Sequence, residues 1–374
     1  MKFGYCTMPV HPPGKAYAQV LREDREAICL ADELGYSEAY VGEHVTDVAE
    51  PVTDSATFLA SLGPLTRQIR LCTGTVNLPN AHPAAVAAKI AMLDHLLEGR
   101  LGFGISVGGL PSDWEMFGTL ELDRRAMFDE SIEHILAIWR SEGPIERSGR
   151  FWTLSTAATA IPAIGQGLMV KPLQRPHPPI VVTAAEPASK SVAYAAERDW
   201  QIISAQFLLP AWVRTHWDTY EETALAAGLR PRREAWRVAK TIFVADDEET
   251  ARRYAFGPTS PYRAYYDQLG FKLIRAGRIN LFKPSAQTPD EAVTTDYLLE
   301  RLVIAGTPAQ VTASIVELVE LVGEFGMLMY CGTDWVEPPL ARRSMELFAT
   351  AVMPEVARRL ATASAETRPP ARGG

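Results

Sequence analysis

The feature that most constrains the fold of this chain is a strand–helix–strand pattern in its first third. An apolar run at residues 69–76 is followed by an amphipathic segment at 84–97 and a second apolar run at 101–106. Two strands joined by one helix of this length predict a βαβ unit with a right-handed connection. The pair Gly108–Gly109, just after the second strand, would let the backbone approach a flat ligand closely.

The same alternation of strand-like and helix-like segments continues through the 374 residues. Eight such repeats predict the α/β class and a (β/α)8 TIM barrel, in which functional groups gather at the C-terminal ends of the strands. A hairpin is expected within residues 143–154. The expected strands are 2–7, 38–43, 69–76, 101–106, 179–184, 201–204, 237–244 and 326–332, and the expected helices include 16–34, 53–65, 84–97, 123–140 and 189–197.

The pattern predicts a single barrel domain over residues 1–361. Residues 256–296, after the seventh strand, are rich in aromatic residues and show no clean periodicity. They are interpreted as a lid-like insertion, with a mobile surface loop as the alternative. The small and polar residues 362–374 predict a disordered tail. The aromatic residues that suggest a closing surface are Tyr262, Tyr265, Tyr266 and Phe271.

Composition narrows the class of protein. The net charge of −8 argues against a nucleic-acid-binding surface. No apolar run approaches the roughly 20 residues that span a bilayer, and the chain enters a strand without a secretory segment, so we expect a cytoplasmic protein with no membrane association. The four scattered cysteines are expected to be free, reduced thiols. They are Cys6, Cys29, Cys72 and Cys331.

Polar residues follow several of the expected strands and would converge in a barrel. They are Glu43 with His44, then His82, Ser106 and Glu186. Each has a structural alternative: His82 as a surface or capping residue, Glu186 as a first-turn carboxylate. No metal site is expected, because no HxH or HxxxH spacing is present. Motifs for a serine nucleophile, a Walker loop or a Rossmann site are also missing from the sequence.

Several spaced motifs resemble the bacterial luciferase-like flavin monooxygenases over nearly the whole chain. Within that family, the N-terminal residues 1–9 and residues 197–200 look most like the limonene and diketocamphane monooxygenases. The motifs are LPNAHP at 78–83, LD at 93–94, EGR at 98–100 and FGI at 103–105, supported by GY at 35–36, VGEH at 41–44, AGTP at 305–308, SMELF at 344–348 and VMP at 352–354.

This resemblance implies a two-component monooxygenase. Reduced FMN (FMNH2) would come from a separate NAD(P)H:flavin reductase, and O2 would be the co-substrate. A flavin C4a-(hydro)peroxide would oxygenate a small hydrophobic substrate, terpenoid or polyketide-like, by Baeyer–Villiger oxidation, hydroxylation or epoxidation. A homodimer through the helices at 53–65 and 84–97 is also implied. The alternatives are a deazaflavin (F420)-dependent hydride-transfer enzyme and a non-catalytic flavin-binding protein.

Carried over by position, the resemblance assigns two catalytic residues. His44 would lie at the flavin edge and protonate or orient the peroxyflavin, for which an ordinary histidine pKa is suited. The hydroxyl of Ser106 would hydrogen-bond the peroxide. Gly74 and Thr75 would form a non-prolyl cis peptide under the flavin ring.

Further positions would bind the polar end of the flavin. Ala185, Glu186 and the following turn correspond to the phosphate-binding segment, and Ser204 to a position near the polar face of the flavin. Two residues depart from the family pattern: Val107 stands where an arginine binds the phosphate, and Pro187 stands where a serine does. Lys190 is the candidate replacement for the missing positive charge, with an ordinary exposed lysine as the alternative.

Overall fold

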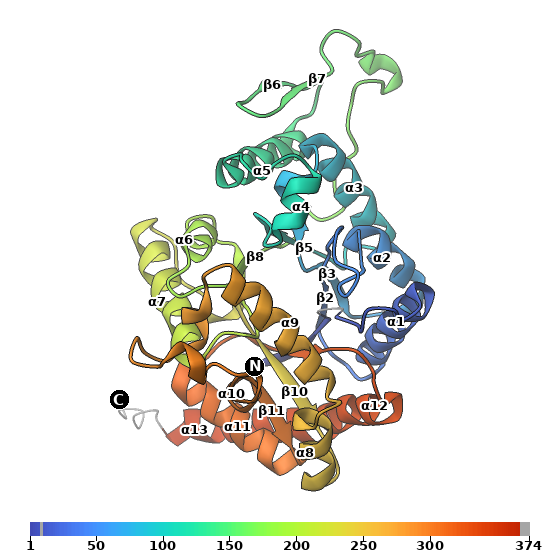
Figure 1. Cartoon of the computed structure of the whole chain (residues 1–374). Coiled ribbons are helices and arrows are strands. Elements are labelled where there is room, and N and C mark those ends of the chain that lie inside the picture. Colours follow the sequence, from blue (N-terminus) through green and yellow to red (C-terminus); the bar gives the residue numbers. More distant parts are fainter. Residues whose placement is uncertain (8–9, 367–374) are drawn as a thin grey trace, which may run out of the picture.

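The computed structural model describes residues 1–7 and 10–366. Within this part, eight parallel strands close into a barrel with helices around it, which confirms the predicted (β/α)8 architecture (Figure 1). The ring closes where the seventh strand of the barrel pairs with both the sixth and the eighth. In spatial order the strands are β1 (Lys2–Thr7), β2 (Glu38–Val41), β3 (Arg70–Thr73), β5 (Leu101–Ser106), β8 (Ile180–Ala184), β9 (Gln201–Ser204), β10 (Trp236–Val244) and β12 (Met327–Gly332).

Helices cover the outside of the barrel, close to the ranges expected from hydrophobic periodicity. Several begin at side chains that accept a hydrogen bond from the first turn, such as Asp54, Asp123 and Asp247. The helices are α1 (Tyr17–Glu33), α2 (Ser55–Leu62), α3 (Pro83–Leu96), α4 (Pro111–Met116), α5 (Arg124–Arg140), α6 (Lys190–Ala196), α7 (Pro210–Ala226), α8 (Glu248–Phe256), α9 (Pro261–Arg275), α10 (Thr295–Leu302), α11 (Pro308–Val322), α12 (Pro338–Leu347) and α13 (Met353–Glu366).

The third strand of the barrel is interrupted near its C-terminal end. The Gly74–Thr75 peptide bond is cis, as the resemblance implied, and it separates β3 from the short β4 (Val76–Asn77). Both pieces pair with β5. Gly104 of β5 faces this break, where a Cβ would lie 2.0 Å from the carbonyl oxygen of Thr73. The close approach of the two strands therefore requires glycine at that position.

The interior of the barrel is filled by side chains. Apolar and thiol groups from alternate strand positions pack in the interior, among them Cys72, Met329 and Cys331. At the N-terminal end, Arg237 forms a bidentate ion pair with Glu38, at 2.8 and 2.9 Å. This end of a TIM barrel serves stability, so function is expected at the opposite end.

The motif Glu98–Gly99–Arg100 has a structural role. Glu98 and Gly99 both have positive φ and turn the chain from α3 into β5. The Arg100 guanidinium then donates to the carbonyl oxygens of Gly63 and Ile69 and to the hydroxyl of Thr66. It thereby satisfies backbone acceptors at the N-terminal end of the barrel. This need for several donors explains why an arginine stands at this position.

Two features differ from the sequence-based expectation, while the predicted hairpin is confirmed. A ninth parallel strand, β11 (Val303–Gly306), pairs with β10 outside the barrel and had not been recognised. The predicted hairpin is present as β6 (Glu146–Ser148) and β7 (Thr153–Ser155). The tail prediction was wrong for residues 362–366, which continue α13, and its remainder, 367–374, lies outside the described residues, as does the Met8–Pro9 motif.

The insertion after the seventh strand is more regular than expected. Its longest element is the 15-residue helix α9, capped by Ser260, which lies in front of β10 in Figure 1. Tyr262, Tyr265 and Tyr266 are buried rather than poised at the surface, and only Phe271 is largely exposed, at 67%. These three tyrosines are already packed over the barrel end, and the lid role of the insertion stays a prediction.

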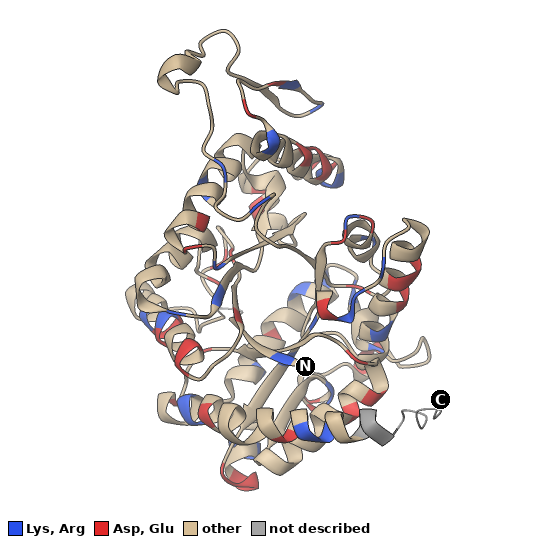
Figure 2. Cartoon of the chain, turned by 180° about the vertical axis from the view of Figure 1, so that it is seen from behind, with Lys and Arg blue, Asp and Glu red and all other residues tan. Residues whose placement is uncertain are grey.

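Charged residues of both signs are interspersed along the outer helices (Figure 2). The described residues contain no helix that is long and apolar enough to cross a membrane.

Candidate functional site

The C-terminal end of β2 leads into a loop that holds His44 between two carboxylates. Its Nδ1 lies 3.0 Å from Oδ2 of Asp113 on α4, and its Nε2 lies 3.1 Å from Oε2 of Glu50. Asp113 also accepts hydrogen bonds from the backbone N–H groups of Val45 and Thr46. Both ring nitrogens of His44 are thus engaged, and the imidazole is fixed in one orientation.

These contacts determine the charge of His44. Burial alone would lower its pKa, but the hydrogen bonds to Asp113 and Glu50 outweigh burial and raise the pKa to about 9. Both carboxyl groups have lowered pKa values: burial opposes the shift, and the hydrogen bond to His44 dominates it. His44 is therefore an imidazolium at neutral pH, and the expectation of an ordinary histidine pKa was wrong.

A second polar chain lies at the ends of β4 and β5. The Thr75 hydroxyl donates to Ser106 Oγ at 2.7 Å, and the Ser106 hydroxyl donates to Oδ1 of Asn77 at 2.7 Å. The backbone N–H of Gly108 also donates to Ser106, at 3.1 Å. A hydroxyl has a single proton. The proton of Ser106 is therefore directed at Asn77, and its oxygen receives two donors.

The segment after β8 carries a positive charge from the insertion. Nη2 of Arg278 donates to the carbonyl oxygen of Ala185 at 3.0 Å and lies 3.8 Å from the Glu186 carboxylate. The backbone N–H of Ala188, in the same turn, donates to the hydroxyl of Thr215. A guanidinium is therefore present at the place where Lys190 was the expected cation, while Lys190 itself is an exposed residue at the start of α6.

Ser204 does not belong to this arrangement. It is fully buried between β9 and the outer helices. Its Oγ lies 2.7 Å from Nδ1 of His216 on α7 and accepts from the indole N–H of Trp236 at 2.8 Å. The expectation that Ser204 faces the flavin is thus contradicted, because its hydroxyl points into the helix layer.

A cavity of about 230 Å³ opens beside His44. Its walls come from the loops after β2 and β4 and from α2, α3 and α4, and include Val76, Asn77 and Phe117. One wall carries Asn80, whose buried Oδ1 has no hydrogen-bond partner among the described residues. The alternative interpretation of His82 holds: it caps α3 by accepting from the Ala84 N–H.

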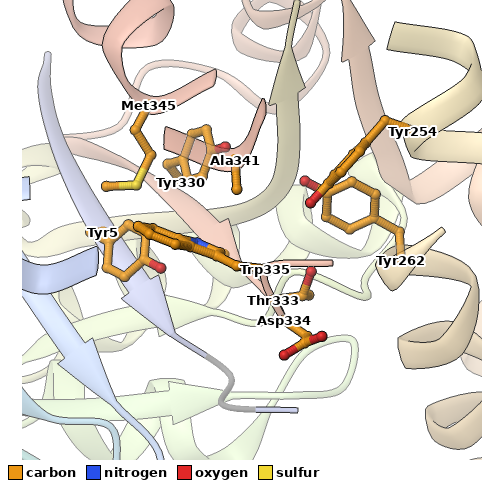
Figure 3. Close-up of a pocket in the computed structure, with 10 residues that line it drawn as sticks. Tyr5, Tyr254, Tyr262, Tyr330, Thr333, Asp334, Trp335, Ala341 and Met345 are labelled. Atoms are coloured by element: carbon orange, nitrogen blue, oxygen red, sulfur yellow. The ribbon is translucent and has the colours of Figure 1, made fainter. Parts of the chain in front are cut away.

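A second pocket lies under the loop after β12 and is lined by four tyrosines, Trp335 and Asp334 (Figure 3). Its volume is about 10 Å³. This is about the space that one water molecule needs, so the pocket offers no room for a substrate.

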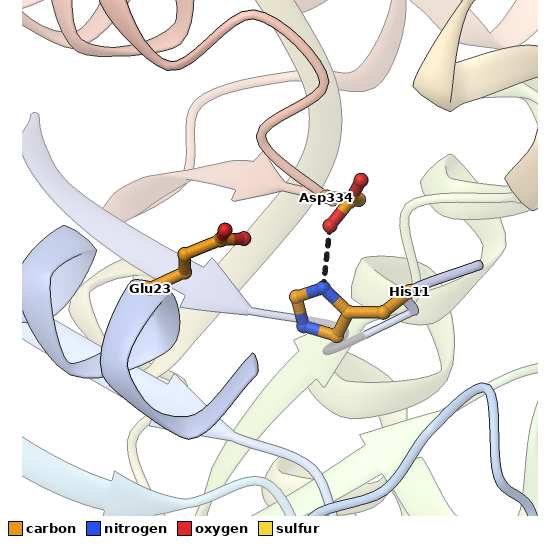
Figure 4. A group of neighbouring side chains, drawn as sticks. All are labelled: His11, Glu23 and Asp334. Carbon is orange, nitrogen blue, oxygen red and sulfur yellow. Dashed lines mark hydrogen bonds and ion pairs between the residues drawn. The ribbon is translucent and has the colours of Figure 1, made fainter. Parts of the chain in front are cut away.

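One group of three side chains in the described part could in principle hold a metal ion: His11, Glu23 and Asp334 (Figure 4). However, the Lys15 ammonium binds both Glu23 and Asp334, so the cation position is already occupied by the chain. Burial lowers the pKa of His11, but hydrogen bonds to Asp24 and Asp334 outweigh it and raise the pKa to about 9. A protonated imidazole cannot ligate a metal, and the group is an internal ion-pair cluster.

Sequence reasoning found His44, Thr75 and Ser106, but not the residues that control His44. Asp113 lies on the six-residue helix α4, and Glu50 lies in an irregular loop. Neither residue is part of a periodic pattern, and Asp113 lies 69 residues after His44 in the sequence. The helix signal Pro111–Ser112–Asp113, with proline in the first turn, could have indicated α4.

Comparison with known proteins agrees with this fold. The family model described as luciferase-like monooxygenase matches residues 1–324. The 4-hydroxyprotoasukamycin monooxygenase of Streptomyces nodosus subsp. asukaensis is 28% identical over 95% of this chain and 92% of its own length. The limonene 1,2-monooxygenase of Rhodococcus erythropolis is 27% identical over 94% and 86%.

A solved structure is also similar over most of its length. It is the oxygenating constituent of 3,6-diketocamphane monooxygenase from Pseudomonas putida, a type II Baeyer–Villiger monooxygenase in complex with FMN. It superposes with a TM-score of 0.86 at 26% identity, covering 95% of this chain and 98% of that one. The expected resemblance to the limonene and diketocamphane enzymes is confirmed. The chain belongs to the luciferase-like monooxygenase family.

Proposed function

We propose that this protein is the oxygenase of a two-component flavin system, which takes reduced FMN from a separate reductase and inserts one oxygen atom of O2 into a hydrophobic substrate. The single observation that carries the proposal is the contact of His44 with two carboxylates, Glu50 and Asp113, beside a cavity at the C-terminal end of the barrel. The names of the limonene and diketocamphane relatives support a terpenoid substrate.

The residues present fit a flavin. Gly109, just after β5, has open space where a Cβ would stand, which leaves its backbone accessible to a planar ring. Thr75 and Ser106 supply hydroxyl groups beside it. Asn80 Oδ1 and the indole N–H of Trp114 are buried and without a hydrogen-bond partner in the described part, as expected where a bound group completes the site.

Arg278 is our candidate for the phosphate. A guanidinium matches the geometry of phosphate oxygens and stays charged at every working pH. Its present partners are one backbone carbonyl and a solvent-exposed carboxylate at 3.8 Å, so a phosphate can join them without breaking a buried ion pair. This residue would supply the charge that Val107 does not.

When bound, reduced FMN would supply the electrons that activate O2. The chain then has three tasks. His44 holds a proton at Nδ1 and at Nε2 and presents a fixed positive charge, which stabilises negative charge that develops nearby. The polar edge of the flavin ring would be oriented by Thr75, Ser106 and Asn77. The buried tyrosines of α9 exclude water from the barrel end.

We also propose a homodimer through α2 and α3. On α3, Met92 and Leu96 are 60% and 55% exposed and lie one helical turn apart. Neighbouring large apolar side chains on a surface mark protein interfaces.

The function is tested by supplying reduced FMN without nicotinamide. The purified protein should consume O2 with photoreduced FMN and should oxidise NADH only when a flavin reductase is added. Rapid NADH turnover by the protein and FMN alone would contradict the two-component proposal. A panel of terpene ketones, limonene and polyketide quinones then identifies the substrate from coupled product formation.

A further inference from the structure

The insertion is attached to the rim of the barrel at two opposite places. Lys272 on α9 binds Asp47 and Glu50 in the loop after β2. Beyond the end of α9, Arg278 contacts the segment after β8. Between these points the Tyr265 hydroxyl accepts from Gln206, and the Tyr266 hydroxyl lies 2.9 Å from that of Thr241. The helix therefore spans the end of the barrel.

Glu50 is shared by two cations. Its Oε1 lies 3.2 Å from Nζ of Lys272, and its Oε2 lies 3.1 Å from Nε2 of His44. The side chain is buried, so solvent cannot replace either partner without cost. One carboxylate thus joins the insertion to the imidazole of the candidate site.

We propose that Lys272 is a positioning residue, which acts through Glu50 to couple the docking of α9 on the barrel rim to the orientation and proton retention of His44. This inference rests on the proposed function only for the role of His44. The contacts themselves are independent of any flavin.

The physical argument follows from the charges around His44. It faces Asp113 on one side and Glu50 on the other, with Asp47 next to Glu50. Lys272 neutralises Asp47 and Glu50 when α9 is docked. Without that charge, three carboxylates would act on one imidazolium, and the proton would be held more tightly. Docking of α9 therefore makes the proton of His44 easier to release.

A purely structural clamp predicts something different. If Lys272 only held α9 in place, its loss would lower thermal stability without changing the charge balance at His44. Removing another ion pair at the rim of the barrel would then lower thermal stability in the same way. Lys89 offers that comparison, because it pairs with Asp54 on the same cavity wall but does not contact His44.

The test is a histidine titration of the full chain without flavin. ¹³C-labelled histidine is followed by NMR from pH 6 to 10.5, with the His44 signal assigned by its loss in His44→Gln. Lys272→Met should shift the His44 midpoint to higher pH, while Lys272→Arg and Lys89→Met should titrate as the native protein does. Glu50→Gln should shift the midpoint to lower pH.

Lys272→Gln provides a second variant if Lys272→Met is unstable, because its amide can still hydrogen-bond to Asp47. An unchanged His44 midpoint in Lys272→Met or in Lys272→Gln overturns the proposal, as does an equal shift in Lys89→Met. The outcome is separate from the proposed function. A failure of the protein to bind reduced FMN would remove the oxygenase assignment but leave these midpoints unaffected.

Discussion

The carboxylate of Asp113 connects the side chain of His44 to the backbone of the residues that follow it. Oδ2 lies 3.0 Å from Nδ1 of His44, while Oδ1 accepts the N–H of Thr46 at 2.9 Å. Asp113 therefore fixes both the ring and the loop that carries it. The contacts of His44 with Asp113 and Glu50 keep it protonated in the folded protein. The stability of the fold therefore depends on pH through this residue.

We predict that stability falls at alkaline pH because of His44. Its pKa is about 9 in the folded protein and about 6.5 in an unfolded chain. A raised folded pKa stabilises fully below the unfolded value, and this contribution is lost as pH rises through the folded value. Between pH 6.5 and 9 the Tm of the native protein should therefore fall by more than the Tm of His44→Gln. His11 titrates in the same window but is common to both proteins. Parallel Tm curves in calorimetry would contradict this prediction.

His44→Ala should leave the fold intact and uncouple oxygen consumption from product formation. Loss of a positioned proton donor costs about 10²–10⁴-fold in rate. The measurement is the ratio of product to hydrogen peroxide, with O2 uptake recorded in parallel. Arg343→Met, which removes an exposed ion pair with Asp246 outside the cavity, serves as the control for a lost ion pair. Full coupling in the alanine variant would exclude His44 from the reaction.

Arg278→Met should weaken the binding of FMN but not of riboflavin, which has no phosphate. Hydrogen bonds to charged groups contribute about 1.5–3 kcal/mol, so the loss should be roughly 10- to 100-fold in Kd. Fluorescence titration of both ligands gives the comparison. Lys190→Met tests the cation expected from the sequence, and it should bind both as the native protein does. If Lys190→Met weakens FMN binding and Arg278→Met does not, the two assignments are reversed.

The proposed dimer predicts that a charge on α3 separates the subunits. Met92 and Leu96 are exposed and one turn apart, so Met92→Lys with Leu96→Lys leaves the core unchanged but opposes burial of this face. Sedimentation velocity at micromolar concentration should show a dimer for the native protein and a monomer for the variant. A native monomer would contradict the interface, and an unchanged dimer in the variant would locate it elsewhere.

The sequence was informative where local pattern determines structure. Alternating apolar segments predicted the barrel strands, and α11 begins at a local capping box formed by Thr307 and Gln310. β11 was missed because four residues between two helices carry little periodic signal. The order of α9 was missed because its tyrosines are buried by the barrel end rather than by a regular apolar stripe.

The site shows the same division. His44, Thr75 and Ser106 follow strands and could be found by their positions. The pKa of His44 could not, because it depends on Asp113 and Glu50, which tertiary contacts bring to opposite sides of the ring. The expected position of Ser204 near the flavin was not found, for a related reason. It ends a strand as expected, but its side chain faces outward to His216 and Trp236.

The central claim, a site built for reduced FMN, is tested most directly by anaerobic fluorescence titration of the purified protein with reduced FMN, oxidised FMN and reduced F420. We predict saturable binding of reduced FMN, tighter than that of oxidised FMN, with F420 bound weakly. Tighter binding of F420 would favour a hydride-transfer enzyme. Equal affinity for both FMN redox states would favour a flavin-binding protein without catalysis, and either result would contradict the account.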